Sequence, residues 1–286
     1  MTKENYTLIT GASSGIGKAM AWYCGSLGMN LILVSLPFEK LDEVAAQIAE
    51  KHKVKTRYFE TDLSQLASAE EVFVWTQEEG LDVNILVNNA GVAGASVFEN
   101  CDHKYIDDRI LLNVRALVML SRLFIPELRK HEQSYILNVA SMAAFFPIPY
   151  KSLYSSSKAF VLYFSRSVRC ELKGTGISVS VVCPNGVRTN LTTNDRINSH
   201  GFIGRITELS ADEVARKGID GMLKGKEVII PGEINYFLLT LQKILPVFIQ
   251  HKLLMKEFKK EVDATAHHNT VIKSGSAYTP LVNPEK

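Results

Sequence analysis

The sequence predicts an α/β fold in which a doubly wound parallel sheet of about seven strands precedes a C-terminal helical extension. Seven short apolar segments alternate with longer segments of helical periodicity, which is typical of βαβ units. Most of the short segments are rich in Val, Ile and Leu without clean alternation, as in strands buried on both faces. A glycine-rich turn follows the first of them. In such a fold a ligand binds at the carboxyl ends of the strands.

The predicted strands and helices follow from these patterns. The strands are Tyr6–Thr10, Asn30–Ser35, Thr56–Thr61, Asn84–Asn89, Ser134–Ala140, Ser178–Cys183 and Glu227–Pro231. The helices include Phe38–His52, Ala67–Glu79, Asp107–Phe124 and one that begins near Tyr150. We expect residues 1–232 to form one nucleotide-binding domain, 233–262 a helical extension, and 263–286 a polar, mobile tail.

Composition excludes several classes of protein. The 286 residues are 46% hydrophobic and 22% charged, with 32 Lys and Arg against 30 Asp and Glu, so no nucleic-acid partner is indicated. The four cysteines form no CxxC pair and the histidines show no metal-ligand spacing, which predicts no metal site and reduced, buried thiols. Without a signal peptide or a stretch of about 18 apolar residues, we expect a cytoplasmic protein.

The turn after the first strand, Thr10–Gly17, has the chemistry of a phosphate-binding loop. Its glycines, Gly11, Gly15 and Gly17, allow a tight turn, a close approach of the pyrophosphate to the backbone, and close packing of helix on strand. The helix that follows presents N–H groups and its positive dipole end to phosphate. This position, between first strand and first helix, predicts a Rossmann-type dinucleotide site.

A second group of residues suits proton transfer. Tyr154 and Lys158 are four residues apart on a predicted helix, so they share one face. A tyrosine pKa of about 10 is lowered by a neighbouring ammonium group, which lets Tyr154 exchange a proton with a carbonyl or an alcohol. Ser141 follows the fifth strand and can hydrogen-bond the same substrate oxygen. No G-x-S-x-G elbow surrounds Ser141, which argues against a hydrolase.

With these residues the chain resembles the short-chain dehydrogenase/reductase family over about residues 6–232. The spacing in Thr10–Gly17, the sequence Asn88–Gly91 and the loop Pro184–Thr189 are similar to its glycine, NNAG and nicotinamide-loop motifs. The resemblance implies a catalytic set of Asn113, Ser141, Tyr154 and Lys158. In it, Asn113 would hold a water that links Lys158 to solvent, and Lys158 would also bind the nicotinamide ribose. The family is commonly dimeric or tetrameric, which implies a homodimer or homotetramer.

The dinucleotide contacts follow from the turn chemistry and from the resemblance, which places Asp62 against the adenine. The predicted set is Gly11, Ser13, Ser14, Gly15, Ile16, Gly17, Ser35, Asp62, Leu63, Asn89, Ala90, Gly91, Tyr154, Lys158, Pro184, Gly186, Val187 and Thr189. One departure is Asn185, which stands between Pro184 and Gly186 where the family has Pro-Gly. Asparagine tolerates left-handed backbone, so we expect the loop to keep its function.

The same positions bear on the choice of dinucleotide. NAD selection usually uses an acid at the end of the second strand, where this chain has Ser35 and then Leu36, so no carboxylate is expected to repel a 2′-phosphate. Leu36 and Ser14 also replace the basic residues that often hold that phosphate. Ser13, Ser14 and Ser35 can donate hydrogen bonds to it and Lys40 can reach it. The sequence therefore favours NADP(H) over NAD(H).

Substrate selectivity is expected from Val92–Ala95, Ala143–Leu153 and a lid over Leu191–Leu209. The middle segment carries Phe145, Phe146, Ile148 and Tyr150, which either line an apolar mouth or simply pack the loop. An apolar mouth suits a hydrophobic ketone or alcohol, such as a 3-oxoacyl, sphingoid or steroid-like compound. The alternative function is a non-catalytic, dinucleotide-sensing protein on the same fold.

The extension Asn235–Lys260 mixes apolar residues with lysines, and Pro246 predicts a break between two helices. Two interpretations stay open for it. It is either an amphipathic surface that contacts a membrane peripherally, or a cover for the pocket or a subunit interface.

Overall fold

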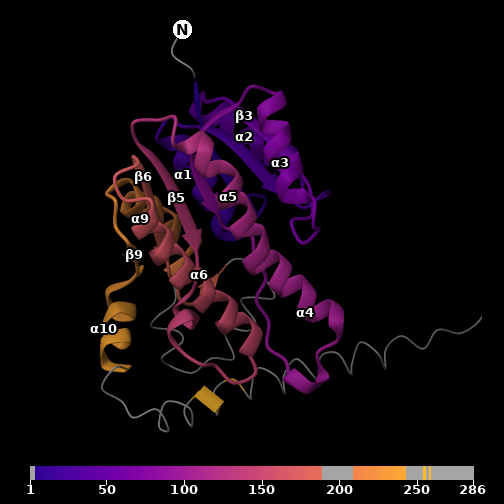
Figure 1. The fold of residues 1–286 in the computed structure, drawn as a ribbon, viewed down its shortest axis with the longest axis vertical. Coiled ribbons are helices and arrows are strands. Elements are labelled where there is room, and N and C mark those ends of the chain that lie inside the picture. The colour runs from indigo at the N-terminus through magenta and orange to yellow at the C-terminus, as the bar shows by residue number, and fades with distance from the viewer. Residues whose placement is uncertain (1–3, 189–208, 243–253, 256–257, 259–286) are drawn as a thin grey trace, which may run out of the picture.

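The computed structural model describes residues 4–188, 209–242, 254–255 and 258. At its centre is a sheet of seven parallel strands in the order β3-β2-β1-β4-β5-β6-β9 (Figure 1). The strands are β1 Asn5–Thr10, β2 Asn30–Ser35, β3 Thr56–Glu60, β4 Asp82–Asn88, β5 Ser134–Val139, β6 Ile177–Val182 and β9 Val228–Ile229. The predicted fold class is confirmed. The order reverses at β1, between β2 and β4, and such a switch point is where a ligand is expected.

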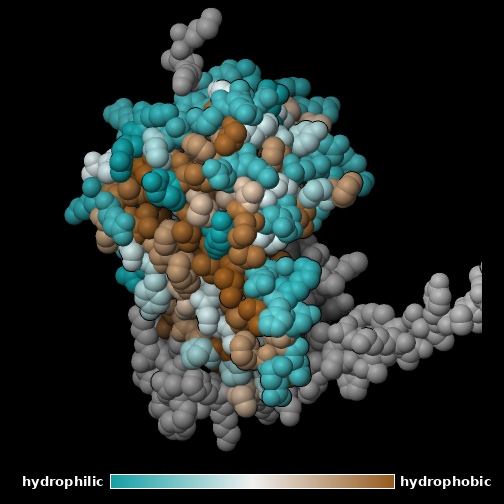
Figure 2. Space-filling model, turned by 45° about the vertical axis from the view of Figure 1, so that its right-hand side comes forward, coloured by the Kyte–Doolittle hydropathy of each residue, from teal (hydrophilic) through white to brown (hydrophobic). Residues whose placement is uncertain are grey.

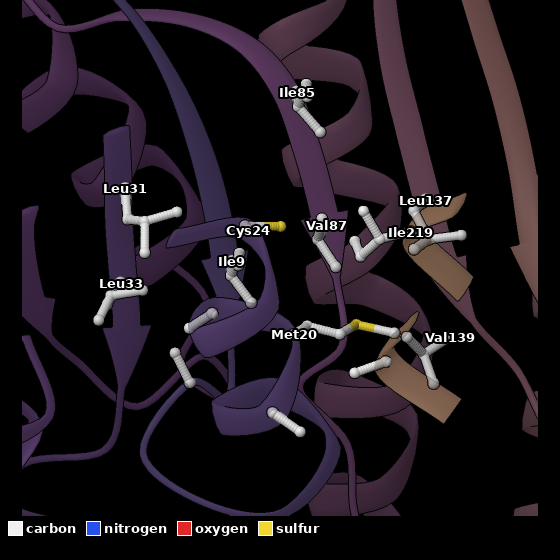
Figure 3. Packing of buried hydrophobic residues seen from close by; sticks show 14 of the residues in the cluster. Ile9, Met20, Cys24, Leu31, Leu33, Ile85, Val87, Leu137, Val139 and Ile219 are labelled. Atoms are coloured by element: carbon white, nitrogen blue, oxygen red, sulfur yellow. The ribbon is translucent and has the colours of Figure 1, made fainter. Parts of the chain in front are cut away.

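Helices cover both faces of the sheet. Successive strand residues point to opposite faces, and apolar side chains on both faces form a core with the helices. Ile9 belongs to the core under α1 (Gly15–Ser26), α2 (Leu41–His52) and α9 (Ala211–Leu223), a cluster that Figure 3 shows from close by. Its neighbour Leu8 belongs to the core on the other face. The helices there are α3 (Ser68–Glu78), α5 (Leu117–Leu128) and α6 (Ser152–Glu171).

The helix expected over Asp107–Phe124 is longer than predicted and is not uniform. It consists of α4 (His103–Ile110), a π-helical segment η2 (Leu111–Ala116) and α5. π-Helical turns are rare and occur frequently at functional sites. Asn113 lies in this one and is buried.

Smaller elements lie at the carboxyl edge and beyond. The 3-10 turns are η1 (Phe98–Asn100) and η3 (Met142–Phe145), and β7 (Val187–Arg188) pairs with β8 (Leu209–Ser210). The expected extension begins as α10 (Glu233–Gln242). Within the residues described, no helix is long and apolar enough to cross a membrane, and no three metal-binding side chains gather.

The strand β3 is at the sheet edge and partly exposed. The catalytic helix begins at Ser152, close to the predicted start near Tyr150, whose φ of 65° is left-handed. The expectation that all four thiols are buried was wrong. Of the cysteines, Cys24 and Cys183 are buried, whereas Cys101 is half-buried and Cys170 is exposed. Thr189, the expected lid up to residue 208, the break at Pro246 and the tail lie outside the described residues.

Candidate active site

The glycine turn and the NNAG segment are joined by hydrogen bonds at the switch point. The Thr10 hydroxyl oxygen accepts bonds from the backbone N–H groups of Asn89 and Ala90, each at 3.0 Å. The Asn89 side chain donates to the carbonyls of Thr10 (2.9 Å) and Gly11 (3.2 Å). A Cβ on Gly17 would lie 2.1 Å from the Gly11 oxygen and 2.4 Å from Asn89 Nδ2. The site therefore has the narrow backbone cradle and free helix N-terminus that a pyrophosphate requires.

Replacing the glycine in this cradle should be costly. We expect Gly17→Ala to lower the free energy of unfolding by about 2 kcal/mol or more, because the new methyl group meets backbone that cannot move aside. Gly28→Ala is the control. It introduces a strained φ of 78° but has open space around the new Cβ, so about 1 kcal/mol is expected. Urea unfolding measures both, and an equal loss would contradict the clash.

Ser141, Tyr154 and Lys158 meet at the carboxyl end of β5. Ser141 caps η3, accepting a bond from Ala143 N at 3.1 Å, while Tyr154 and Lys158 face the same way from α6. Burial raises the pKa of Tyr154 above its usual 10, and a hydrogen bond with Ser141 acts in the opposite direction. The lowered pKa expected for this tyrosine from the lysine alone is not found. Tyr154 is therefore a neutral phenol at neutral pH, the form that donates a proton.

Lys158 is buried beside the end of β5. Its ammonium donates to the carbonyl of Val139 at 2.9 Å, and its Nζ lies 6.0 Å from the centre of the Tyr154 ring. Burial lowers the pKa of Lys158 to about 8. Gly91 leaves room for this arrangement, because a Cβ there would be 3.3 Å from Lys158 Nζ and 3.0 Å from Asn113 Oδ1.

The side chain of Asn113 clamps the segment after NNAG. Its Oδ1 accepts from Val92 N at 2.8 Å, and its Nδ2 donates to Val92 O at 2.9 Å and to Ser157 Oγ at 3.2 Å. Asn113 thus fixes the start of the substrate-side loop and borders Lys158. The water-holding role that the resemblance implies for it stays a prediction.

Asp62, expected to contact the adenosine part of a dinucleotide, is held by local hydrogen bonds. Asp62 accepts from Ser64 N at 2.9 Å and Ser64 Oγ at 2.7 Å. Burial opposes ionisation of Asp62, but the bonds from Ser64 and Gln65 outweigh it and lower the pKa of the carboxyl group. Leu63, the next residue, is buried in the core. Asp62 is thus an ionised acceptor at neutral pH.

One expectation about the site for the adenosine ribose was wrong. The sequence placed no carboxylate near Ser35, but the Glu39 side chain turns back to the strand end. Glu39 Oε2 accepts a hydrogen bond from Ser35 at 2.6 Å and another from Ser13, and the two serine oxygens are 2.7 Å apart. Sequence reasoning missed Glu39 because it lies four residues beyond the strand.

On the substrate side the loops contact one another and the extension. Ser96 N donates to the carbonyl of Tyr150 at 2.8 Å, which joins the segments after β4 and before α6. Phe145 packs against the core and Ile148 is buried, so these two pack the loop rather than line a mouth. Lys151 lies over the ring of Phe258 at 4.5 Å, which brings the C-terminal extension to this loop.

The nicotinamide loop is also tied to the extension. Asn185 Nδ2 donates to Asn235 Oδ1 at 3.0 Å, and Asn235 Nδ2 donates to Pro231 O at 2.9 Å. Pro184 and Val187 are buried, and Gly186 accepts a backbone bond from Leu209. Asn185, the departure from the family pattern, therefore anchors the loop to α10.

Sequence reasoning also missed a buried polar network beneath the site. Asn88 Nδ2 donates to Asn138 Oδ1 at 2.9 Å and to Ser121 Oγ at 3.1 Å, and Asn138 Nδ2 donates to Ser165 Oγ at 2.8 Å. These bonds connect β4 and β5 with α5 and α6. Their sequence signals were Asn88, which belongs to the NNAG segment, and Asn138, a polar residue within the fifth apolar segment.

Residues 5–200 match the family model described as short chain dehydrogenase. The chain belongs to this family.

Known proteins that are similar to this chain act on lipid-like compounds according to their names. It is 36% identical over 193 residues to a very-long-chain 3-oxoacyl-CoA reductase from Anas platyrhynchos, covering 65% of this chain and 61% of that protein. It is 30% identical over 266 residues to 17-beta-hydroxysteroid dehydrogenase type 3 from Danio rerio, covering 90% and 82%. The match thus spans about three fifths of the first relative.

The fold has close structural counterparts as well. A short-chain dehydrogenase from Sphingobium yanoikuyae in complex with NADPH aligns with a TM-score of 0.73 at 26% identity, over 99% of both chains. A 7beta-hydroxysteroid dehydrogenase aligns with a TM-score of 0.76 at 26% identity, over 84% of this chain and 92% of that one.

Proposed function

We propose that this protein is an oxidoreductase that transfers a hydride between a nicotinamide dinucleotide and a hydrophobic ketone or secondary alcohol. The observation that carries the proposal is the meeting of Ser141, Tyr154 and Lys158 beside a glycine cradle that a dinucleotide fits. A dinucleotide-sensing protein needs the cradle but has no need of a proton donor.

The chain's own residues account for the proton in this reaction. A bound dinucleotide would supply the hydride. During reduction Tyr154, a neutral phenol whose pKa is raised further by burial, donates its proton to the carbonyl oxygen while the Ser141 hydroxyl holds that oxygen and stabilises its developing charge. The ammonium of Lys158 offsets the negative charge left on the phenolate, and it would also hold the nicotinamide ribose of a bound dinucleotide, as the family resemblance implies. Asn113 holds the Val92 backbone in place beside it.

The pKa of Lys158 predicts how the reaction responds to pH. Lys158 is charged below a pKa of about 8 and neutral above it, while Tyr154 stays protonated over the same range because its pKa is raised. For reduction, we expect kcat/KM for the dinucleotide to be level at pH 6–7 and to fall above about pH 8. Initial rates across pH 6–10 measure this, and a level profile up to pH 10 would contradict it.

We propose a lipid-like substrate, of the 3-oxoacyl, sphingoid or steroid-like class. The names of the relatives support this class, and so does the approach of Phe258 to the substrate-side loop. A panel of carbonyl compounds, followed by the absorbance of the reduced dinucleotide, tests it. Long-chain 3-oxoacyl thioesters and ketosteroids should be reduced faster than short, polar ketones. Preference for the polar ketones would contradict the proposed class.

We also propose that the protein forms a homodimer or homotetramer through the exposed face of α6. Figure 2 shows apolar side chains in a band down one face of the molecule, and α6 exposes Phe160 and Tyr163, with Phe160 stacked on Phe164. Light scattering would give the mass in solution, and a monomer would contradict this proposal.

Peripheral contact between residues 235–260 and a membrane is a separate proposal. The exposed Ile234, Tyr236 and Phe237 on α10 support it. Co-sedimentation with liposomes tests it, and an absence of binding would contradict it.

A further inference from the structure

We propose that Glu39 selects the dinucleotide, by accepting a hydrogen bond from the adenosine ribose and excluding a 2′-phosphate. The inference rests on the proposed function, and it reverses the preference for NADP(H) that the sequence alone favours. It is carried by the cluster of Ser13, Ser35 and Glu39 at the carboxyl end of β2.

The cluster lies where the adenosine ribose of a dinucleotide is recognised. Ser13 belongs to the glycine turn and Ser35 is the last residue of β2, and the turn is tied to this strand by the bond from Ala12 N to Val34 O at 3.2 Å. In folds of this class an acidic residue about 20 residues after the glycine turn binds the ribose 2′-hydroxyl. Glu39 reaches this place although it follows the strand end by four residues.

The backbone directs Glu39 to this place. Its two neighbours, Phe38 and Lys40, have φ values of 66° and 56°, in the left-handed region that such residues rarely adopt. Phe38 is 99% exposed, so burial of its ring does not explain this conformation. The two left-handed residues turn the chain so that Glu39 points back toward the strand end.

The hydrogen bonds of the cluster suit a hydroxyl group better than a phosphate. The hydroxyls of Ser13 and Ser35 both lie within hydrogen-bonding distance of Glu39 Oε2, so their protons are directed at the carboxylate. They are therefore not available to a 2′-phosphate, which has only acceptors to offer. Glu39 is an exposed residue whose Oε1 carries neither serine bond and can accept from a ribose hydroxyl.

The negative charge of Glu39 also disfavours binding of a 2′-phosphate. A 2′-phosphate beside Glu39 would be repelled by its carboxylate. Lys40, the cation that the sequence placed near this phosphate, is instead paired with Glu43 at 3.1 Å, and its side chain is 74% exposed. The cluster therefore opposes NADP(H) through both hydrogen bonding and charge.

The test is binding of NADH and of NADPH to the full chain, measured by isothermal titration without substrate. We expect the unmodified protein to bind NADH about tenfold or more tightly than NADPH. Glu39→Gln should reduce this ratio about tenfold, mainly through tighter NADPH binding. Glu43→Gln is the matched control: it removes the same charge from an exposed position nearby and should leave the ratio within about twofold.

Three results would overturn the inference, and one of them would overturn the proposed function as well. Tighter binding of NADPH by the unmodified protein, or a ratio that Glu39→Gln and Glu43→Gln change equally, would overturn the role of Glu39 alone. A protein that binds neither nucleotide would overturn the proposed function as well. Thermal unfolding of each variant, measured beside the titrations, confirms that the variants compared are folded.

Discussion

Replacing Tyr154 with phenylalanine should lower turnover by about 10³-fold or more while changing dinucleotide affinity by less than about threefold. The hydroxyl is the proposed proton donor, and its loss would leave no acid in contact with the carbonyl oxygen. The ring itself stays in place, so the neighbouring cradle keeps its shape. Turnover with a reactive ketone and titration with dinucleotide measure the two effects separately.

The same helix supplies a control for this variant. Tyr163 lies on α6, is 64% exposed, and Tyr163→Phe should change neither quantity. Undiminished turnover in Tyr154→Phe would refute the proposed mechanism. If instead the unmodified protein bound dinucleotide but reduced no carbonyl compound, the dinucleotide-sensing alternative would be favoured.

Much of the sheet could be predicted because local sequence decides it. The apolar run Asn30–Ser35 has the bounds of β2, and the glycine turn lies where strand and helix patterns meet. The exposure of β3 could not be predicted, because it depends on the strand order, which places Thr56–Glu60 at an edge. Likewise, the start of the catalytic helix depends on Tyr150, whose carbonyl is held by Ser96 from a distant loop.

In the candidate active site, too, some features follow from local sequence and others depend on the packed structure. That Tyr154 and Lys158 share one helix face could be predicted from the helix period, whereas their proposed roles come from the family resemblance. The raised pKa of Tyr154 could not, since it comes from burial that only the packed structure defines. Glu39 could not be placed either, because its direction depends on two left-handed residues that sequence patterns rarely indicate.

Burial of Lys158 also implies that the site is maintained at the expense of stability. In the unfolded chain a lysine has a pKa of about 10.4, whereas burial lowers the pKa of Lys158 to about 8 in the fold. Between these values the unfolded state binds more protons, so the contribution of this group to stability rises with pH. Below pH 8 the unfavourable burial of the charge is fully present.

We therefore expect Lys158→Met to abolish reduction and to raise the free energy of unfolding. Methionine fills a similar volume without a charge, at the expense of the bond to Val139 O. The expected net gain is about 1 kcal/mol at pH 6, or about 2–4 °C in Tm. The gain should shrink as pH rises from 8 toward 10, because the lysine loses its charge in the folded protein.

A surface lysine separates this effect from a general gain in hydrophobicity. Lys130 is 58% exposed and paired with Glu127, so Lys130→Met should change Tm little, and by the same amount at every pH from 6 to 10. Thermal unfolding of both variants across this range is the measurement. A Lys158→Met protein that is less stable than the unmodified chain at pH 6 would show that the bond to Val139 outweighs burial of the charge. The lysine would then stabilise the fold as well as serve the reaction.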